Sequence, residues 1–275
     1  MSSRPSAAVG GLFVFALTVL LILLNRDAQV LTLFWKSFGP YVDFVQQMMG
    51  YIVIACLGAF AMRAEGIKWG DLGLSRNNLL LSLPLLAVFF AGNVALVYAA
   101  GGWSQAFRPV VAGLPLWAVA ASIIIVAFTE EFVFRGFVQI GTARRFGITQ
   151  GILVSAMVFS LVHVPTDLAG VAPGSDATGV IMTLAMAAVG RFLFSALAFS
   201  YMYQFTGNLY ITIMTHAFYD FSLTYLVVTG GTLTIVLLYL VVPYIVVLTV
   251  YYSAPFRGLL RRPAAEPGRG APPVS

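Results

Sequence analysis

The sequence predicts an all-α fold, a polytopic bundle of about eight transmembrane helices. Hydrophobic residues make up 60% of the 275 positions and charged residues only 9%, and the mean hydropathy is +0.93. Soluble globular domains contain about 45–50% apolar and about 25% charged residues, so this chain has too little charged surface for a water-soluble fold. The high hydrophobicity also excludes a disordered chain.

Eight apolar stretches have close to the roughly 20 residues that a helix needs to cross a bilayer. Each stretch is flanked by charged residues, Pro or Gly. The predicted spans are Val9–Leu24, Val45–Met62, Leu79–Ala100, Leu116–Thr142, Ile148–Val164, Val180–Gln204, Leu209–Val228 and Leu233–Tyr252. The first span ends in Asn25–Asp27 with no small-residue cleavage site, which favours a retained signal-anchor helix over a cleaved signal peptide.

The basic residues outside the spans predict the orientation of the chain. With eight spans, both termini and the loops after the second, fourth and sixth spans share one side, which holds ten Lys and Arg, whereas the other side holds Arg26, Lys36 and Arg108. The positive-inside rule therefore places both termini in the cytoplasm. We expect residues 1–253 to form the transmembrane domain of a multi-pass cell-membrane protein, and the Pro-, Gly-, Ala- and Arg-rich residues 254–275 a disordered cytoplasmic tail.

Charged residues inside the predicted spans are candidates for function, because each costs at least about 2.5–3.5 kcal/mol on insertion scales. In the fourth span, Glu131 and Arg135 are four residues apart, so they can form an ion pair on one helix face. Glu130 is rotated by about 100° from Glu131 and points elsewhere. A buried carboxylate without an intrahelical cation suits a general base. The alternative is that the three charges only clamp helices together.

Both histidines of the chain, His163 and His216, fall inside predicted spans, at depths where they can meet Glu130. Asp220 lies four residues after His216 on the same helix face, where a carboxylate can orient the imidazole or bind a metal itself. Phe159 lies four residues before His163 and can pack on its ring. Interhelical packing without chemistry is the alternative for the histidine pair.

Other polar residues near the spans have structural interpretations. Gly207–Asn208 is typical of a helix break followed by an N-cap. Arg191 has no obvious partner within its own helix, and its candidate partners are Glu130, Glu131 and Asp220. A position in a water-filled cavity is the alternative for this arginine. Asp167 and Asp176 lie in a polar segment after the fifth span, and we expect them to be solvated.

Three short motifs carry a resemblance to a known family. Residues Glu130–Arg135 read EEFVFR, Phe159–His163 read FSLVH and His216–Asp220 read HAFYD. In this order they resemble the EExxxR, FxxxH and HxxxN/D motifs of the CPBP family of CAAX proteases and bacteriocin-processing proteins, also called Abi. That family includes the type II CAAX prenyl endopeptidases. The resemblance covers about Thr129–Phe221, within a core of about residues 116–228.

The resemblance implies an intramembrane endopeptidase that hydrolyses a peptide bond of a membrane-associated or lipidated protein or peptide. Carried over residue by residue, Glu130 is the catalytic base that activates water. His163 and His216 are catalytic or metal-binding, and Glu131 and Arg135 form the supporting pair. Any one motif would be a weak signal, but three motifs in order on predicted spans are a specific one.

Asp220 takes the last catalytic position, where type II prenyl endopeptidases usually carry Asn. An amide can donate a hydrogen bond to an oxyanion, whereas an ionised aspartate cannot. The departure favours a role in orienting His216 or in binding a metal, and it argues against assuming a prenylated substrate. His163, His216 and Asp220 are candidate ligands of a divalent metal such as Zn²⁺. Hydrolysis by Glu and His without a metal is the alternative.

The expected partners are a membrane-bound protein or peptide substrate and the lipid bilayer. Nucleic acid is not expected, because no dense Lys/Arg run lies outside the tail. A proton-coupled transporter would also place Glu, His and Arg inside the membrane, but the two halves of the chain show no repeat. A non-catalytic scaffold with a protease-like fold would have lost a motif residue, and none is lost apart from the Asn/Asp ambiguity at Asp220.

Overall fold

The computed structural model describes residues 42–80, 82–84, 87, 91, 116–169, 171 and 174–225. These residues form helices and turns with no strand among them, which agrees with the predicted all-α class. The first and eighth predicted spans, most of the third, and the tail at 254–275 lie outside the described residues. The count of eight spans and the cytoplasmic termini therefore stay predictions.

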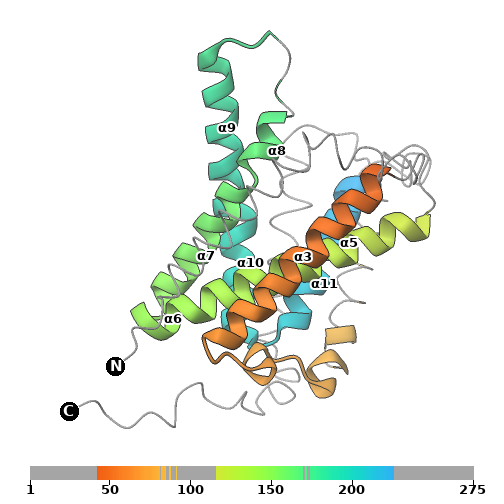
Figure 1. Ribbon diagram of the computed structural model, residues 1–275, viewed down its shortest axis with the longest axis vertical. Helices are drawn as coiled ribbons and strands as arrows, with labels where there is room; N and C mark the ends of the chain where they lie inside the picture. Colours follow the sequence, from red (N-terminus) through yellow and green to blue (C-terminus); the bar gives the residue numbers. More distant parts are fainter. Residues whose placement is uncertain are drawn as a thin grey trace.

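Figure 1 shows the helices that the described residues form. In chain order they are α3 (Val42–Ala64), the 3₁₀ turn η2 (Trp69–Leu72), α5 (Leu116–Glu131), the π-helix η3 (Phe132–Gln139), α6 (Ile140–Phe146), α7 (Ile148–Val162), α8 (Val164–Ala169), α9 (Ala177–Arg191), the π-helix η4 (Phe192–Ala196), α10 (Leu197–Thr206) and α11 (Leu209–Tyr225).

The fourth to seventh predicted spans coincide with helices. The fourth runs without a break from α5 through η3 and continues to Phe146, a turn beyond its predicted end. By length and composition, one helix of the described residues, Ile148–Leu168, can cross a membrane on its own. Met48–Ala64 and Trp69–Leu80 pass the same test as a broken pair, bent by 114°.

The π-helical segments η3 and η4 are not predicted by the hydrophobic pattern. All eight residues of η3 are buried, including Arg135 and Gln139. A π-turn departs from the regular repeat of the α-helix, and such segments are frequent at functional sites. The segment η3 follows Glu130 and Glu131 directly, so the change in helical repeat falls inside the first motif.

The helix formed by α5 and η3 lies between other helices. In Figure 1, α3 crosses beside α5, and α11 packs against α5 from another side. The helix α7 packs against η3, and Gly151 makes this approach possible because a Cβ there would lie 2.7 Å from the carbonyl oxygen of Gln139. The main core therefore gathers apolar side chains from several helices, including Phe132, Phe137, Ala156, Phe159, Leu209 and Ile213.

The predicted break at Gly207–Asn208 is confirmed. Gly207 ends α10 with φ 56°, a left-handed conformation that glycine adopts without strain. The Asn208 side chain accepts a hydrogen bond from the Tyr210 backbone N–H at 3.1 Å, as an N-cap of α11 does. Gly73, also left-handed at φ 70°, packs so close to this turn that a Cβ would overlap the carbonyl of Gly207. The turn that positions α11 is thus held by the segment after α3.

Candidate active site

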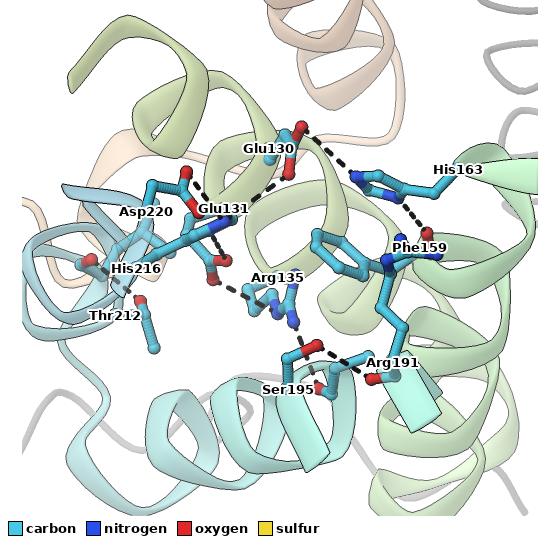
Figure 2. Close-up of polar contacts among 12 residues, drawn as sticks. Glu130, Glu131, Arg135, Phe159, His163, Arg191, Ser195, Thr212, His216 and Asp220 are labelled. Carbon is cyan, nitrogen blue, oxygen red and sulfur yellow. Dashed lines mark hydrogen bonds and ion pairs between the residues drawn. The ribbon is translucent and has the colours of Figure 1, made fainter. Parts of the chain in front are cut away.

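Figure 2 shows that the charged side chains of the three motifs converge. Glu130 and Glu131 come from the end of α5, Arg135 from η3, His163 from the junction of α7 and α8, and His216 from α11. Residues far apart in the chain are thereby brought within ion-pair distance of Glu130.

The ion pair of Glu131 and Arg135 is fully buried. Arg135 Nε lies 3.2 Å from Glu131 Oε2, and both side chains have 0% exposure. Arg135 Nη2 also donates to the carbonyl of Ala196 at 3.1 Å, in η4. The guanidinium carbon lies 4.6 Å from the centre of the Phe159 ring, within the range of a cation–π contact. The predicted intrahelical pair is present, and it also ties η3 to η4 and α7.

Glu130 takes no part in the ion pair of Glu131 and Arg135 and makes contacts of its own. Its Oε1 accepts a hydrogen bond from the Tyr51 hydroxyl at 3.1 Å and lies 3.7 Å from His163 Nε2. Its Oε2 lies 3.8 Å from His216 Nε2. Both imidazole distances exceed a direct hydrogen bond. Two atoms so separated can each lie about 2.8 Å from one shared water oxygen.

The two histidines present the same ring nitrogen to Glu130. His163 Nδ1 lies 2.8 Å from the carbonyl of Phe159, which can only accept, so this nitrogen donates. His216 Nδ1 lies 2.8 Å from Glu131 Oε1 and donates to that carboxylate in the same way. These two Nδ1 hydrogen bonds hold the imidazole rings so that both Nε2 atoms face Glu130.

Asp220 lies next to His216, one turn along α11. Its Oδ2 is 3.6 Å from His216 Nε2. Three carboxylates therefore surround one imidazole, because Glu131 lies 2.8 Å from Nδ1 and Glu130 lies 3.8 Å from Nε2. The ring of Phe199 stacks on His216 with a centroid distance of 5.0 Å and an interplanar angle of 24°.

The charged cluster contains the three candidate metal ligands. His163, His216 and Asp220 offer two imidazoles and a carboxylate, which is the ligand chemistry of a catalytic zinc. Within the described part of the chain, however, no three His, Cys, Asp or Glu side chains are arranged to bind one ion.

Three contributions to this site are absent from the sequence interpretation. Tyr51 of α3 bonds to Glu130, Phe199 of α10 stacks on His216, and the Ala196 carbonyl accepts from Arg135. Phe159 does more than pack on His163, because its carbonyl, as well as its ring, contacts motif residues. The sequence does not distinguish these aromatic residues from others, because core helices contain many aromatic residues that only pack.

The expectation for Arg191 is wrong. Its partner is Asp167, with Nη1–Oδ2 and Nη2–Oδ1 distances of 2.7 and 2.8 Å, rather than a carboxylate of the motifs. Asp167 is therefore paired rather than simply solvated, and Asp176 caps α9 by accepting from Gly179 N–H at 2.7 Å. This bidentate pair joins α8, which directly follows His163, to α9.

The comparisons with known proteins identify one related family. Residues 112–222 match the family model described as Type II CAAX prenyl endopeptidase Rce1-like. The matched segment contains all three motifs and ends two residues after Asp220, whereas Tyr51 lies before it. No curated protein and no solved structure matches the chain.

Proposed function

Because residues 112–222 of this chain form an Rce1-like domain, we propose that the protein is an intramembrane endopeptidase that hydrolyses a peptide bond of a membrane-bound protein or peptide. The observation that carries the proposal is the convergence of one carboxylate, Glu130, with the Nε2 atoms of His163 and His216. This arrangement places a base beside two imidazoles in a largely buried position, where charge–charge interactions are strong.

In the proposed first step, Glu130 is the base that activates water. A water molecule beside Glu130 Oε1 and His163 Nε2 donates one hydrogen bond to each, because Nδ1 of His163 already carries the ring proton. The water oxygen attacks the carbonyl carbon of the peptide bond while its proton moves to Glu130. Glu130 then returns this proton to the amide nitrogen as the C–N bond breaks.

In the same mechanism, His216 stabilises the oxyanion. Glu130, Glu131 and Asp220 carry three negative charges and Arg135 one positive charge, so neutral histidines leave two excess negative charges. A proton on His216, which is within 3.8 Å of each carboxylate, offsets part of this excess. The imidazolium then donates from Nε2 to the negative oxygen of the tetrahedral intermediate.

Glu131 and Arg135 are supporting residues in this proposal. Neither has exposed side-chain surface, and Glu131 uses one oxygen for His216 and the other for Arg135. Their role is to orient His216 and to compensate charge. Glu130, and not this pair, transfers the proton directly.

The substitution of Asp220 tests whether its carboxylate acts on His216. Asp220→Ala is expected to lower the cleavage rate about tenfold, because it removes the polar group that lies 3.6 Å from His216 Nε2. Asp220→Asn is expected to keep most of the activity, because the amide places a polar oxygen at the same position beside His216 Nε2. Initial rates of both variants on the same substrate measure this, and an Ala variant as active as wild type would contradict the role.

The membrane setting is part of the proposal. The Rce1-like match and the apolar helix Ile148–Leu168 support an integral membrane protein, and the eight predicted spans make it multi-pass in the cell membrane. The substrate then reaches the site from the bilayer or its surface. The family match supports hydrolysis over the proton-coupled transporter and the non-catalytic scaffold.

The proposal is tested by comparing membrane peptides from cells with wild-type protein and with Glu130→Gln. A protease leaves a new peptide terminus that is present with wild type and missing with the variant, and this terminus identifies the substrate. Glu65→Gln is the matched control, because Glu65 pairs with Arg145 at 2.9 Å outside the candidate site. No terminus that depends on Glu130 would contradict the protease and favour the transporter or the scaffold.

A further inference from the structure

Tyr51 is the part of the candidate site that lies outside the family match. Its hydroxyl donates to Glu130 Oε1 at 3.1 Å, a shorter contact than either histidine makes with this carboxylate. It comes from α3, which ends at Ala64, well before the matched residues 112–222 begin. Neither the motifs nor the family match assigns a role to this residue.

The packing of α3 fixes where Tyr51 lies. Gly58 is two helical turns after Tyr51 and therefore on the same face of α3. A Cβ at Gly58 would lie 3.0 Å from Val133 Cγ2 and 3.3 Å from the Phe132 ring, so this face of α3 packs directly on η3. The phenol is thus presented to Glu130 by a helix that is itself in close contact with the first motif.

The Glu130 carboxylate needs such an anchor. The terminal torsion of a glutamate has a broad energy minimum, so the side chain alone does not fix the direction of its two oxygens. The histidine nitrogens at 3.7 and 3.8 Å are beyond direct hydrogen bonds, whereas Tyr51 is within range. A donor on Oε1 determines the carboxylate plane and directs Oε2 toward His216.

We propose that Tyr51 is a positioning residue for Glu130: its hydroxyl holds the carboxylate in the plane in which one oxygen faces His163 and the other faces His216. The consequence for the chemistry rests on the proposed endopeptidase function. The hydrogen bond between Tyr51 and Glu130 does not depend on that function, because it is present in the protein without substrate.

Tyr51→Phe tests the proposal, because it removes the hydroxyl and keeps the ring. Tyr203→Phe is the matched control, since the Tyr203 hydroxyl makes a hydrogen bond of the same 3.1 Å length to the carbonyl of Asp71, away from Glu130. The first readout is the infrared carboxylate band of purified protein that disappears in Glu130→Gln. This band is expected to shift in Tyr51→Phe and to stay in place in Tyr203→Phe.

The second readout is cleavage of an internally quenched peptide, made with an S-farnesyl cysteine and with a free cysteine. Tyr51→Phe is expected to lower kcat about tenfold with KM unchanged, because the missing hydrogen bond orients the base Glu130 and does not contact the substrate. Tyr203→Phe is expected to keep the wild-type kcat.

The outcomes separate this proposal from the protease function. An unshifted Glu130 band overturns the positioning role, as does an unchanged or increased kcat in Tyr51→Phe. A kcat loss of equal size in Tyr203→Phe also overturns it, since the effect would then be structural. A wild type that cleaves neither peptide contradicts the proposed function for these substrates, while the infrared band still decides the role of Tyr51.

Discussion

Replacing Glu130 with glutamine is expected to abolish peptide-bond cleavage and to leave the fold intact. The amide has the shape of the carboxylate and its oxygen can still accept the Tyr51 hydrogen bond, but it cannot take a proton from water. Loss of a general base lowers rates by about 10²–10⁴-fold, which reduces cleavage to background. The measurement is the initial rate on the quenched peptides, together with the thermal unfolding midpoint in detergent.

The controls for Glu130→Gln separate chemistry from folding. Glu65→Gln makes the same chemical change in a surface ion pair and is expected to keep both rate and midpoint. His163→Ala is expected to lose cleavage as well, because it removes the nitrogen 3.7 Å from Glu130 Oε1. Cleavage by Glu130→Gln at a substantial fraction of the wild-type rate would refute the assignment of Glu130 as the base.

Replacing Arg135 with alanine is expected to cause a large loss of stability. Arg135 has no exposed side-chain surface, pairs with Glu131 at 3.2 Å, donates to the Ala196 carbonyl and lies over the Phe159 ring. The change removes the cation that pairs with the buried Glu131 carboxylate, and breaking a buried pair in this way costs about 3–5 kcal/mol. Denaturant or thermal unfolding in detergent, followed by circular dichroism, measures the loss.

Two further variants make the Arg135 prediction specific. Arg145→Ala breaks the Arg145–Glu65 pair, in which the arginine side chain is 32% exposed, and is expected to cost no more than about 1 kcal/mol. Combining Arg135→Met with Glu131→Leu is expected to be less destabilising than Arg135→Ala alone, because both charges of the pair are then replaced together by apolar side chains. A cost for Arg135→Ala as small as that for Arg145→Ala would show that the buried pair contributes little.

Local relations along one helix could be predicted from the sequence. The four-residue spacing of Glu131 and Arg135 predicts their pair, and the roughly 100° rotation of Glu130 predicts that it does not join this pair. Gly207–Asn208 predicts the break and the cap before α11, because left-handed glycines and side-chain caps act within a few residues. Such relations depend on backbone geometry, which is the same in every α-helix.

Relations between helices were predicted less well. Arg191 pairs with Asp167, and nothing in the spacing of these two residues distinguishes this pair from the three candidates on other helices. The π-helical segments also have no signature in hydrophobic spacing. All eight residues of η3 are buried, the polar ones included, so the pattern of apolar residues does not mark the change in helical repeat. Tyr51 could not be recognised, because its contact with Glu130 depends on how closely α3 packs on η3.

The sequence by itself determined that the described chain is helical and apolar and which few charges lie inside it. Scarce charges in an apolar chain are costly to bury, so Glu130, Glu131 and Arg135 stand out without any structure. Only the tertiary structure decided which partner each of them meets. The convergence of His163, His216 and Tyr51 on Glu130 depends on the packing of three separate helices against α5 and η3. Packing of this kind depends on side-chain shape across the whole core, which the spacing of residues in one segment does not contain.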